Sequence, residues 1–208
     1  MRKSKFFFIT FEGIEGSGKS YQSRRLYKNI KKKNKPAILT REPGGSISSE
    51  QIRKVILSGA KNKFLKTTDT LLYLAARNEH YNKLLKPMIK KTNIICDRFT
   101  DSTLAYQVHG KGVNGKLVEN IHRNILGKFK PDLTFILTVS LKKAFTRMKK
   151  RKFKNRYDKF SKEFYKKVQD AFIKLAKKNT KRYFVLDNTI DNKNVEKIIF
   201  NKFLKLSQ

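Results

Sequence analysis

Residues 6–20 read Phe-Phe-Phe-Ile-Thr-Phe-Glu-Gly-Ile-Glu-Gly-Ser-Gly-Lys-Ser, an apolar run that leads directly into the pattern G-x-x-x-x-G-K-S. Between a strand and a helix, this pattern builds a phosphate-binding loop, because glycines let backbone N–H groups turn inward around phosphate oxygens. A β-prone run precedes the pattern here, and residues 21–33 read as a helix. The stretch therefore predicts a nucleoside-triphosphate site rather than a chance match in a glycine-rich turn.

The residues of this loop suggest how it would hold a triphosphate. Lys19 can reach the β- and γ-phosphates, and the Ser20 hydroxyl can ligate Mg²⁺. The helix that follows directs its positive end at the anion. We expect ATP as co-substrate, Mg²⁺ as cofactor, and phosphate contacts from Gly13, Ile14, Glu15, Gly16, Ser17, Gly18, Lys19 and Ser20.

Length and composition bound the class of protein. The 208 residues suit one domain over 1–208, and 38% hydrophobic with 12% aromatic residues supply one core. No apolar run approaches the roughly 20 residues of a membrane helix, so no membrane partner is expected. The only cysteine, Cys96, lies in an apolar run and excludes an internal disulfide, which favours a reducing cytoplasm.

The formal net charge of +34 has two interpretations. It can indicate nucleic-acid binding, or a lysine- and asparagine-rich compositional bias laid over an ordinary enzyme. The lysines are spread along the whole chain, whereas a binding patch should be clustered. We therefore favour bias, expect no specific nucleic-acid partner, and expect the field to attract anionic nucleotides.

Apolar runs alternate with helical patterns along the chain, which predicts an α/β fold with a five-stranded parallel sheet and helices on both faces. The expected strands are Lys5–Phe11, Ala37–Thr40, Asn93–Cys96, Leu133–Val139 and Tyr183–Leu186. Pro87 should kink or shorten the long helix that contains it. The expected helices are Lys19–Lys33, Ser49–Leu57, Asp69–Lys90, Ser102–Val108, Lys116–Leu126, Leu141–Lys150, Lys162–Lys177 and Asn192–Leu206.

Asp97 and Arg98, which follow the third expected strand, have side chains suited to phosphoryl transfer. Asp97 ends that strand beside the phosphate loop, where a carboxylate can hold Mg²⁺ or its waters. Arg98 can grip an acceptor phosphate with a bidentate fork. Tyr73 and Arg77 are four apart on one helix face, which suits stacking on a base and hydrogen bonding to its edge. From these two residues alone, core packing plus a solvated charge is the preferred explanation.

Three segments narrow the class of kinase. They are Arg41–Gly45 (REPGG), Leu71–Arg77 (LLYLAAR) and Asp97–Gln107 (DRFTDSTLAYQ). Together with the phosphate loop they resemble bacterial-type thymidylate kinases, which carry REPGG, L-L-x-x-A-A-R and D-R-x-x-x-S-x-x-A-Y-Q in this order. The resemblance implies the P-loop nucleoside monophosphate kinase fold, transfer of the γ-phosphoryl of ATP to dTMP, and a homodimer.

The resemblance also implies which residues bind dTMP. Tyr73 stands where the family usually has a phenylalanine that stacks on thymine, and Arg77 matches the arginine that hydrogen-bonds the base at O4. Arg98 matches the arginine that binds the dTMP phosphate, and Glu15 an acid that positions the sugar 3′-hydroxyl. The remaining expected contacts come from Pro43, Arg53, Ser102, Thr103, Tyr106 and Gln107.

The basic segment at about 147–160 resembles the lid of these enzymes. The phosphate loop has no arginine between Gly13 and Gly18, so the cation that neutralises the transferred phosphoryl must come from elsewhere. The family's lid pattern D-R-x-E stands here as Asn155-Arg156-Tyr157-Asp158. We expect Arg156 to be the catalytic lid arginine, acting with Lys19, Arg98 and Glu15, and Arg151 to be the second candidate; a solvated basic helix end remains the alternative.

Two other functions remain open at this stage. One is a P-loop kinase acting on a different nucleoside monophosphate or a small metabolite. The other is a nucleic-acid-binding ATPase, motivated by the charge, although no aromatic-interleaved basic motif is present. The adenine pocket is poorly marked, with 187–189 after the last strand as its candidate lining.

Overall fold

The central strand is the apolar run that precedes the phosphate loop. In the computed structural model, which describes residues 6–152, 155–190 and 192–207, β1 covers Phe8–Glu12 and all five of its residues are buried. It lies between β3 (Asn93–Asp97) and β4 (Leu133–Thr138) in a parallel sheet of order β2-β3-β1-β4-β5. The outer strands are β2 (Ala37–Arg41) and β5 (Tyr183–Asp187).

The register brings the functional strand ends to one edge of the sheet. Phe11 lies opposite Asp97, Arg41 lies opposite Asp97 on the other side, and Glu12 lies opposite Ile136. Ligands of open α/β sheets bind outside the carboxyl ends of the strands, where the strand order reverses. The loops after β1, β2 and β3 therefore meet where a nucleotide site is expected.

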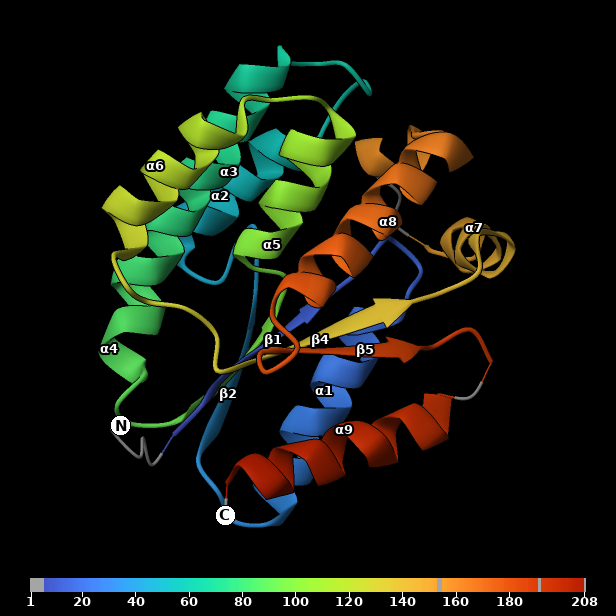
Figure 1. Cartoon of the computed structure of the whole chain (residues 1–208). Helices are drawn as coiled ribbons and strands as arrows, with labels where there is room; N and C mark the ends of the chain where they lie inside the picture. Colours follow the sequence, from blue (N-terminus) through green and yellow to red (C-terminus); the bar gives the residue numbers. More distant parts are fainter. Residues whose placement is uncertain (1–5, 153–154, 191, 208) are drawn as a thin grey trace.

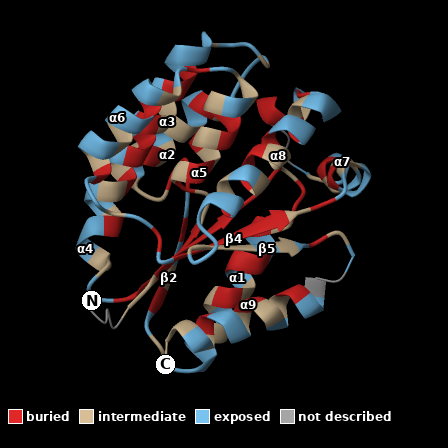
Figure 2. Ribbon diagram, in the orientation of Figure 1, coloured by how far each residue is buried: buried red, intermediate tan, exposed pale blue. Residues whose placement is uncertain are grey.

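Helices cover both faces of the sheet, as Figure 1 shows. On one face, α1 (Lys19–Lys32) and α9 (Asn192–Leu206) pack on the buried side chains of β1 and β4. On the other, α8 (Lys162–Lys178) packs beside a layer of shorter helices. The strands are mostly buried and the outer helix faces exposed (Figure 2). The remaining helices include α2 (Ile47–Leu57), α3 (Lys66–His80), α4 (Lys86–Met88), α5 (Thr100–Thr103), α6 (Gly115–Leu126) and α7 (Leu141–Lys149).

The predicted five-stranded parallel sheet is confirmed, and the differences lie in the helices. The long helix expected over Asp69–Lys90 begins at Lys66, widens into a π-helical turn at Tyr81–Leu85 and ends at Met88. Pro87 has no backbone N–H, and its ring would crowd the preceding turn, which accounts for the break. The helix expected over Ser102–Val108 is α5 followed by a π-helical segment, Leu104–Gly110.

Smaller differences arise at element ends. The helix α2 begins at Ile47 rather than Ser49, because the Ser46 side chain accepts the Ser49 N–H and caps it. The strand β1 begins at Phe8, and the expected first residue, Lys5, lies outside the described residues. A short 3₁₀ turn at Arg156–Lys159 in the lid was not predicted from the sequence.

Candidate active site

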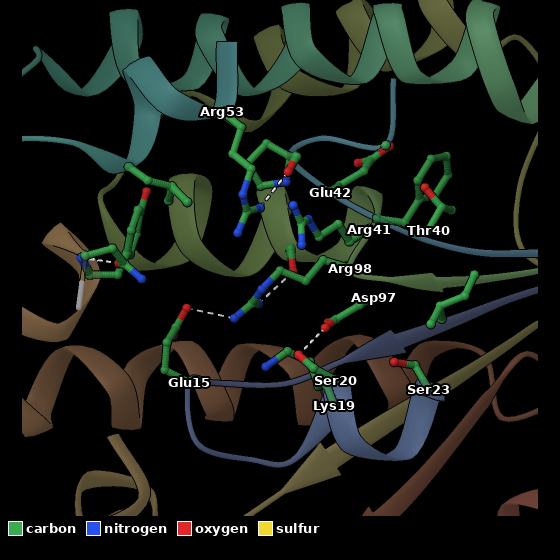
Figure 3. A pocket seen from close by; sticks show the side chains of 18 of the residues that line it. Glu15, Lys19, Ser20, Ser23, Thr40, Arg41, Glu42, Arg53, Asp97 and Arg98 are labelled. Atoms are coloured by element: carbon green, nitrogen blue, oxygen red, sulfur yellow. Dashed lines mark hydrogen bonds and ion pairs between the residues drawn. The ribbon is translucent and has the colours of Figure 1, made fainter. Parts of the chain in front are cut away.

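A cavity of about 1160 Å³ opens at the carboxyl edge of the sheet (Figure 3). It is larger than the roughly 300–1,000 Å³ of a typical small-molecule pocket, as expected for two nucleotides. The phosphate loop, the loop after β2, α3, the segment after β3 and the lid all contribute to its wall. The expected site residues that line it are Glu15, Gly16, Gly18, Lys19, Ser20, Pro43, Arg53, Tyr73, Arg77, Asp97, Arg98, Ser102, Thr103, Tyr106, Gln107 and Arg151.

The phosphate loop keeps its shape because two of its glycines cannot be replaced. Gly13 has φ of 140°, and a Cβ there would lie 2.3 Å from the Leu137 carbonyl oxygen. Gly18, with φ of 90°, forms the N-cap of α1 in the left-handed conformation. The first turn of α1 contains no acidic residue, and the positive end of its dipole favours an anion at the phosphate loop.

Lys19 lies folded along this loop. Its Nζ donates to the Ile14 carbonyl at 2.7 Å and contacts Ser17 Oγ at 3.4 Å. Burial, followed by the positive charge of Arg98, lowers the pKa of Lys19 to about 7. Two cations held close together in a buried loop favour the arrival of an anion.

Ser20 and Asp97 meet beneath the cavity, and Figure 3 shows the hydrogen bond between them. Ser20 donates to Asp97 Oδ2, whereas Oδ1 is buried without a hydrogen-bond partner. An unpartnered carboxylate oxygen beside a hydroxyl fits Mg²⁺, which binds through one or two carboxylates, waters and substrate phosphates. The described part of the chain has no cluster of three or more His, Cys, Asp or Glu side chains that could hold a metal by itself.

Arg98 joins the segment after β3 to the phosphate loop. Its backbone has φ of 74°, a left-handed conformation that is rare for residues other than glycine and is found mostly at functional sites. The guanidinium donates to the Gly13 carbonyl at 3.0 Å, to Ser102 Oγ at 3.0 Å and to Glu15 at 2.7 Å. Figure 3 shows the contact between Arg98 and Glu15. Tyr106 also donates to Glu15. Burial opposes the charge of Glu15, but Arg98 and Lys19 outweigh it and lower the Glu15 pKa.

Glu12 holds this strained turn, and the sequence analysis did not identify it. Its buried carboxylate accepts the Phe99 N–H at 2.7 Å and the Ser102 hydroxyl at 2.5 Å. Burial, followed by the nearby Asp101, raises the pKa of Glu12 to about 8. The sequence does place an ionisable side chain between an apolar strand and the first glycine of the loop. From the sequence alone this position indicates only that the strand ends there.

The buried guanidinium of Arg77 closes the far side of the cavity. It forms an ion pair with Glu42 at 2.7 Å and donates to Thr103 Oγ1 at 2.8 Å and to the Phe99 carbonyl at 3.0 Å. His122 of α6 lies 2.6 Å from Nη1. The sequence analysis missed Glu42 and His122 as members of this network. Glu42 lies within the REPGG segment, whereas no local pattern marks His122.

The remaining acceptor-side residues connect the cavity wall to the lid. Arg53 donates to the Pro43 carbonyl at 2.6 Å, which fixes the loop after β2 (Figure 3). The rings of Tyr73 and Tyr157 are 6.3 Å apart in an edge arrangement, and Gln107 contacts the Tyr157 hydroxyl at 3.4 Å. The part of the cavity wall where a base would bind, at Tyr73 and Gln107, therefore contacts the lid turn through Tyr157.

The lid differs from expectation in the placement of its arginines. Arg156 is buried and ion-paired with the buried Asp69 of α3, which also pairs with Lys111 at 2.6 Å. It therefore fixes the lid to α3 instead of facing the cavity. Arg151 lines the cavity, its side chain is 37% exposed, and its contact with Asp158 is long at 3.5 Å. Asp158 forms a capping box with Asn155. Residues 153–154 of the lid lie outside the described part of the chain.

The segment 187–189 lies beside the phosphate loop. Asn188 is buried and donates to the Ser17 carbonyl at 2.7 Å. Arg147 donates to the carbonyls of Gly16 and Asn188, both at 3.0 Å. This segment therefore supports the back of the loop, and its contact with adenine stays a prediction.

A phosphate loop, a Ser–Asp pair fit for Mg²⁺ and an arginine-lined acceptor cavity on this parallel sheet define a P-loop kinase. The sequence model of the family "Thymidylate kinase" matches residues 11–199. Thymidylate kinases of Mycoplasma capricolum and of Wolbachia pipientis wMel are 38% and 40% identical, over 96% and 92% of this chain and 93% and 99% of theirs. The crystal structure of thymidylate kinase from Ehrlichia chaffeensis matches with a TM-score of 0.76 at 34% identity, covering 96% of this chain and 98% of that one.

The chain belongs to the thymidylate kinase family and is a dTMP kinase, a phosphotransferase. This excludes the other P-loop kinases left open by the sequence patterns alone. Across the described residues, none of the helices is both long and apolar enough to cross a membrane.

Proposed function

We propose that the cavity binds ATP along the phosphate loop and dTMP between Arg98 and Arg77, and that the γ-phosphoryl passes directly from one to the other. The observation that carries this proposal is the position of Arg98, which is bonded to the phosphate loop at Gly13 and Glu15 and to Ser102 of the acceptor segment. A guanidinium at this junction can hold the acceptor phosphate facing the donor.

Catalysis then requires positioning and charge neutralisation and little acid–base chemistry. Lys19 and Arg98 supply fixed positive charge on the two sides of the transferred group. Ser20 and Asp97 would hold Mg²⁺, which when bound neutralises phosphate charge. The unpartnered Asp97 oxygen supports this assignment.

Arg151 is our choice for the lid cation, in place of Arg156. Arg151 lines the cavity, and among the described residues its ion pair with Asp158 is long, at 3.5 Å, so it can turn toward a phosphate. Arg156 would have to leave the buried Asp69 carboxylate, which would then keep only Lys111 as a cationic partner, at a cost of about 1–3 kcal/mol. Arg156 and Asp158 then hold the lid's shape.

The acceptor base would lie between Tyr73 and Arg77. The Tyr73 ring offers a stacking face, Arg77 a donor toward O4, and Pro43 a surface near the 5-methyl group. Thr103 and Gln107 lie in the same wall, and Glu15 would accept the 3′-hydroxyl. Cytosine presents an amine at position 4, which would leave the arginine unpaired, so we expect dCMP to be rejected.

The test is Arg98→Ala. Loss of a charge-assisted contact to the acceptor phosphate should lower kcat/KM for dTMP by roughly 10² or more, while the Kd for ATP should change less than about threefold. The exposed Arg123→Ala on α6 is the matched control and should behave as wild type. An unchanged kcat/KM for dTMP in Arg98→Ala would contradict the proposed acceptor site.

We also propose a homodimer in the cytoplasm. Exposed apolar side chains on three neighbouring helices, Val55 of α2, Leu71 of α3 and Leu117 of α6, support an interface on this layer. Cys96 is a free, buried thiol, which suits a reducing compartment.

A further inference from the structure

Most N–H groups of the Arg77 guanidinium are hydrogen-bonded inside the protein. Nε donates to Glu42, Nη2 donates to the Phe99 carbonyl, and Nη1 donates to Thr103 and contacts His122; Glu42 also forms an ion pair with Nη2. An arginine has five N–H donors, so these hydrogen bonds with the described residues use four of them, and one N–H of Nη2 is not used by any of them. The Arg77 guanidinium, which is predicted to recognise the base, is therefore held in place by residues of several elements before a nucleotide binds.

His122 completes this set from behind the cavity wall. It is half-buried on α6, a helix that packs against α3, which carries Arg77. A guanidinium cannot accept a hydrogen bond, so the 2.6 Å contact requires a neutral imidazole that accepts at Nε2 and carries its proton on Nδ1. Burial, with the charge of Arg77, lowers the pKa of His122 to about 3, so the acceptor form persists at neutral pH.

Thr103 and His122 hold Nη1 from two directions. Thr103 belongs to α5, in the segment that lines the cavity, and His122 belongs to α6 outside it. Glu42 and Phe99 fix the opposite edge of the guanidinium through Nε and Nη2. Without the acceptor on α6, the Nη1 end would be held by Thr103 alone and could turn about the Glu42 contact.

We propose that His122 is a positioning residue that sets nucleobase specificity, because its imidazole accepts from Arg77 and aims the guanidinium at the base of the acceptor nucleotide. The inference rests on the base-reading role proposed for Arg77. His122 does not itself touch the base, so its loss should weaken acceptor binding and discrimination and leave the phosphoryl-transfer groups in place.

The test compares His122→Leu and His122→Ala, which lack an acceptor, with His122→Gln, whose amide oxygen can lie near the Nε2 position. The first two should raise KM for dTMP roughly tenfold, keep kcat within about twofold, leave KM for ATP unchanged and narrow the preference for dTMP over dCMP. His122→Gln should stay within about threefold of wild type. The exposed His109→Leu, on the π-helical segment, is the matched control.

An unchanged KM for dTMP in both acceptor-free variants would overturn the inference, as would an equal rise in KM for ATP, which would indicate general loosening. Arg77→Lys separates this result from failure of the base-reading role. If Arg77→Lys raises KM for dTMP and the His122 variants do not, only the inference about His122 fails. If Arg77→Lys also has no effect, the base-reading assignment fails as well.

Discussion

At the level of single residues, two basic side chains lie close together in this site before any substrate binds. Burial and the charge of Arg98 lower the Lys19 pKa to about 7, so Lys19 is only partly protonated at neutral pH, and Glu15 offsets this effect in part. The phosphates of ATP and dTMP would relieve this repulsion. Positive charge that is fixed in advance needs no reorganisation during the reaction, which is the main source of electrostatic catalysis.

The two lid arginines should respond oppositely to truncation. Arg151→Ala removes a mobile cation from the cavity and should lower kcat roughly 10²-fold while leaving the melting temperature nearly unchanged. Arg156→Ala leaves Asp69 paired with Lys111 alone and should lower the unfolding free energy by about 1–3 kcal/mol. Steady-state kinetics and denaturant unfolding of both variants measure the difference. The assignment would be contradicted if Arg151→Ala kept a normal kcat while Arg156→Ala lost kcat and stayed fully stable. Arg156 would then be the catalytic lid arginine.

At the scale of elements, sequence patterns predict the strands and the phosphate loop well, because both depend on local hydrophobicity and spacing. The pairing of Arg156 with Asp69 joins residues 87 positions apart, so the lid pattern could not show which arginine turns inward. The same holds for Glu12 with Phe99 and for His122 with Arg77. The sequence predicts a break near Pro87, but not that it takes the form of a π-helical turn at Tyr81–Leu85.

Glu12 ties β1 to the segment after β3, and this tie should make stability depend on pH. Its pKa rises from 4.5 in the ordinary carboxyl to about 8 in the fold, so the native state holds a proton that the unfolded chain has released. Between these values the unfolding free energy should fall as pH rises, by at most about 1.4 kcal/mol per pH unit.

Glu12→Gln removes this titration. The unfolding free energy of the variant should therefore increase relative to that of wild type as pH rises from 6 to 8. Urea unfolding across this range measures the difference, with the exposed Glu119→Gln of α6 as the control. Parallel stability profiles for wild type and Glu12→Gln would show that Glu12 is already ionised in the folded protein.

The whole molecule carries a net charge of +34 on a fold whose family acts on small nucleotides. Such a field draws anionic substrates toward the cavity and repels itself, and it can also attract DNA without specificity. Lysines and arginines lie on every α-helix except α5 and are spread along the chain, so they do not gather on one element as a nucleic-acid site would require. Phosphoryl transfer to dTMP should therefore be independent of DNA.

The most direct measurement is a coupled ADP-release assay with ATP and Mg²⁺ and a panel of dTMP, dUMP, dCMP, dGMP, AMP and UMP, with and without DNA. The account predicts a strong preference for dTMP, slower turnover of dUMP because the 5-methyl group contributes only about 1–3 kcal/mol, little activity with dCMP, and no effect of DNA. Equal activity with dCMP would contradict base reading through Arg77. Activity that appears only with DNA would contradict the acceptor site as a whole.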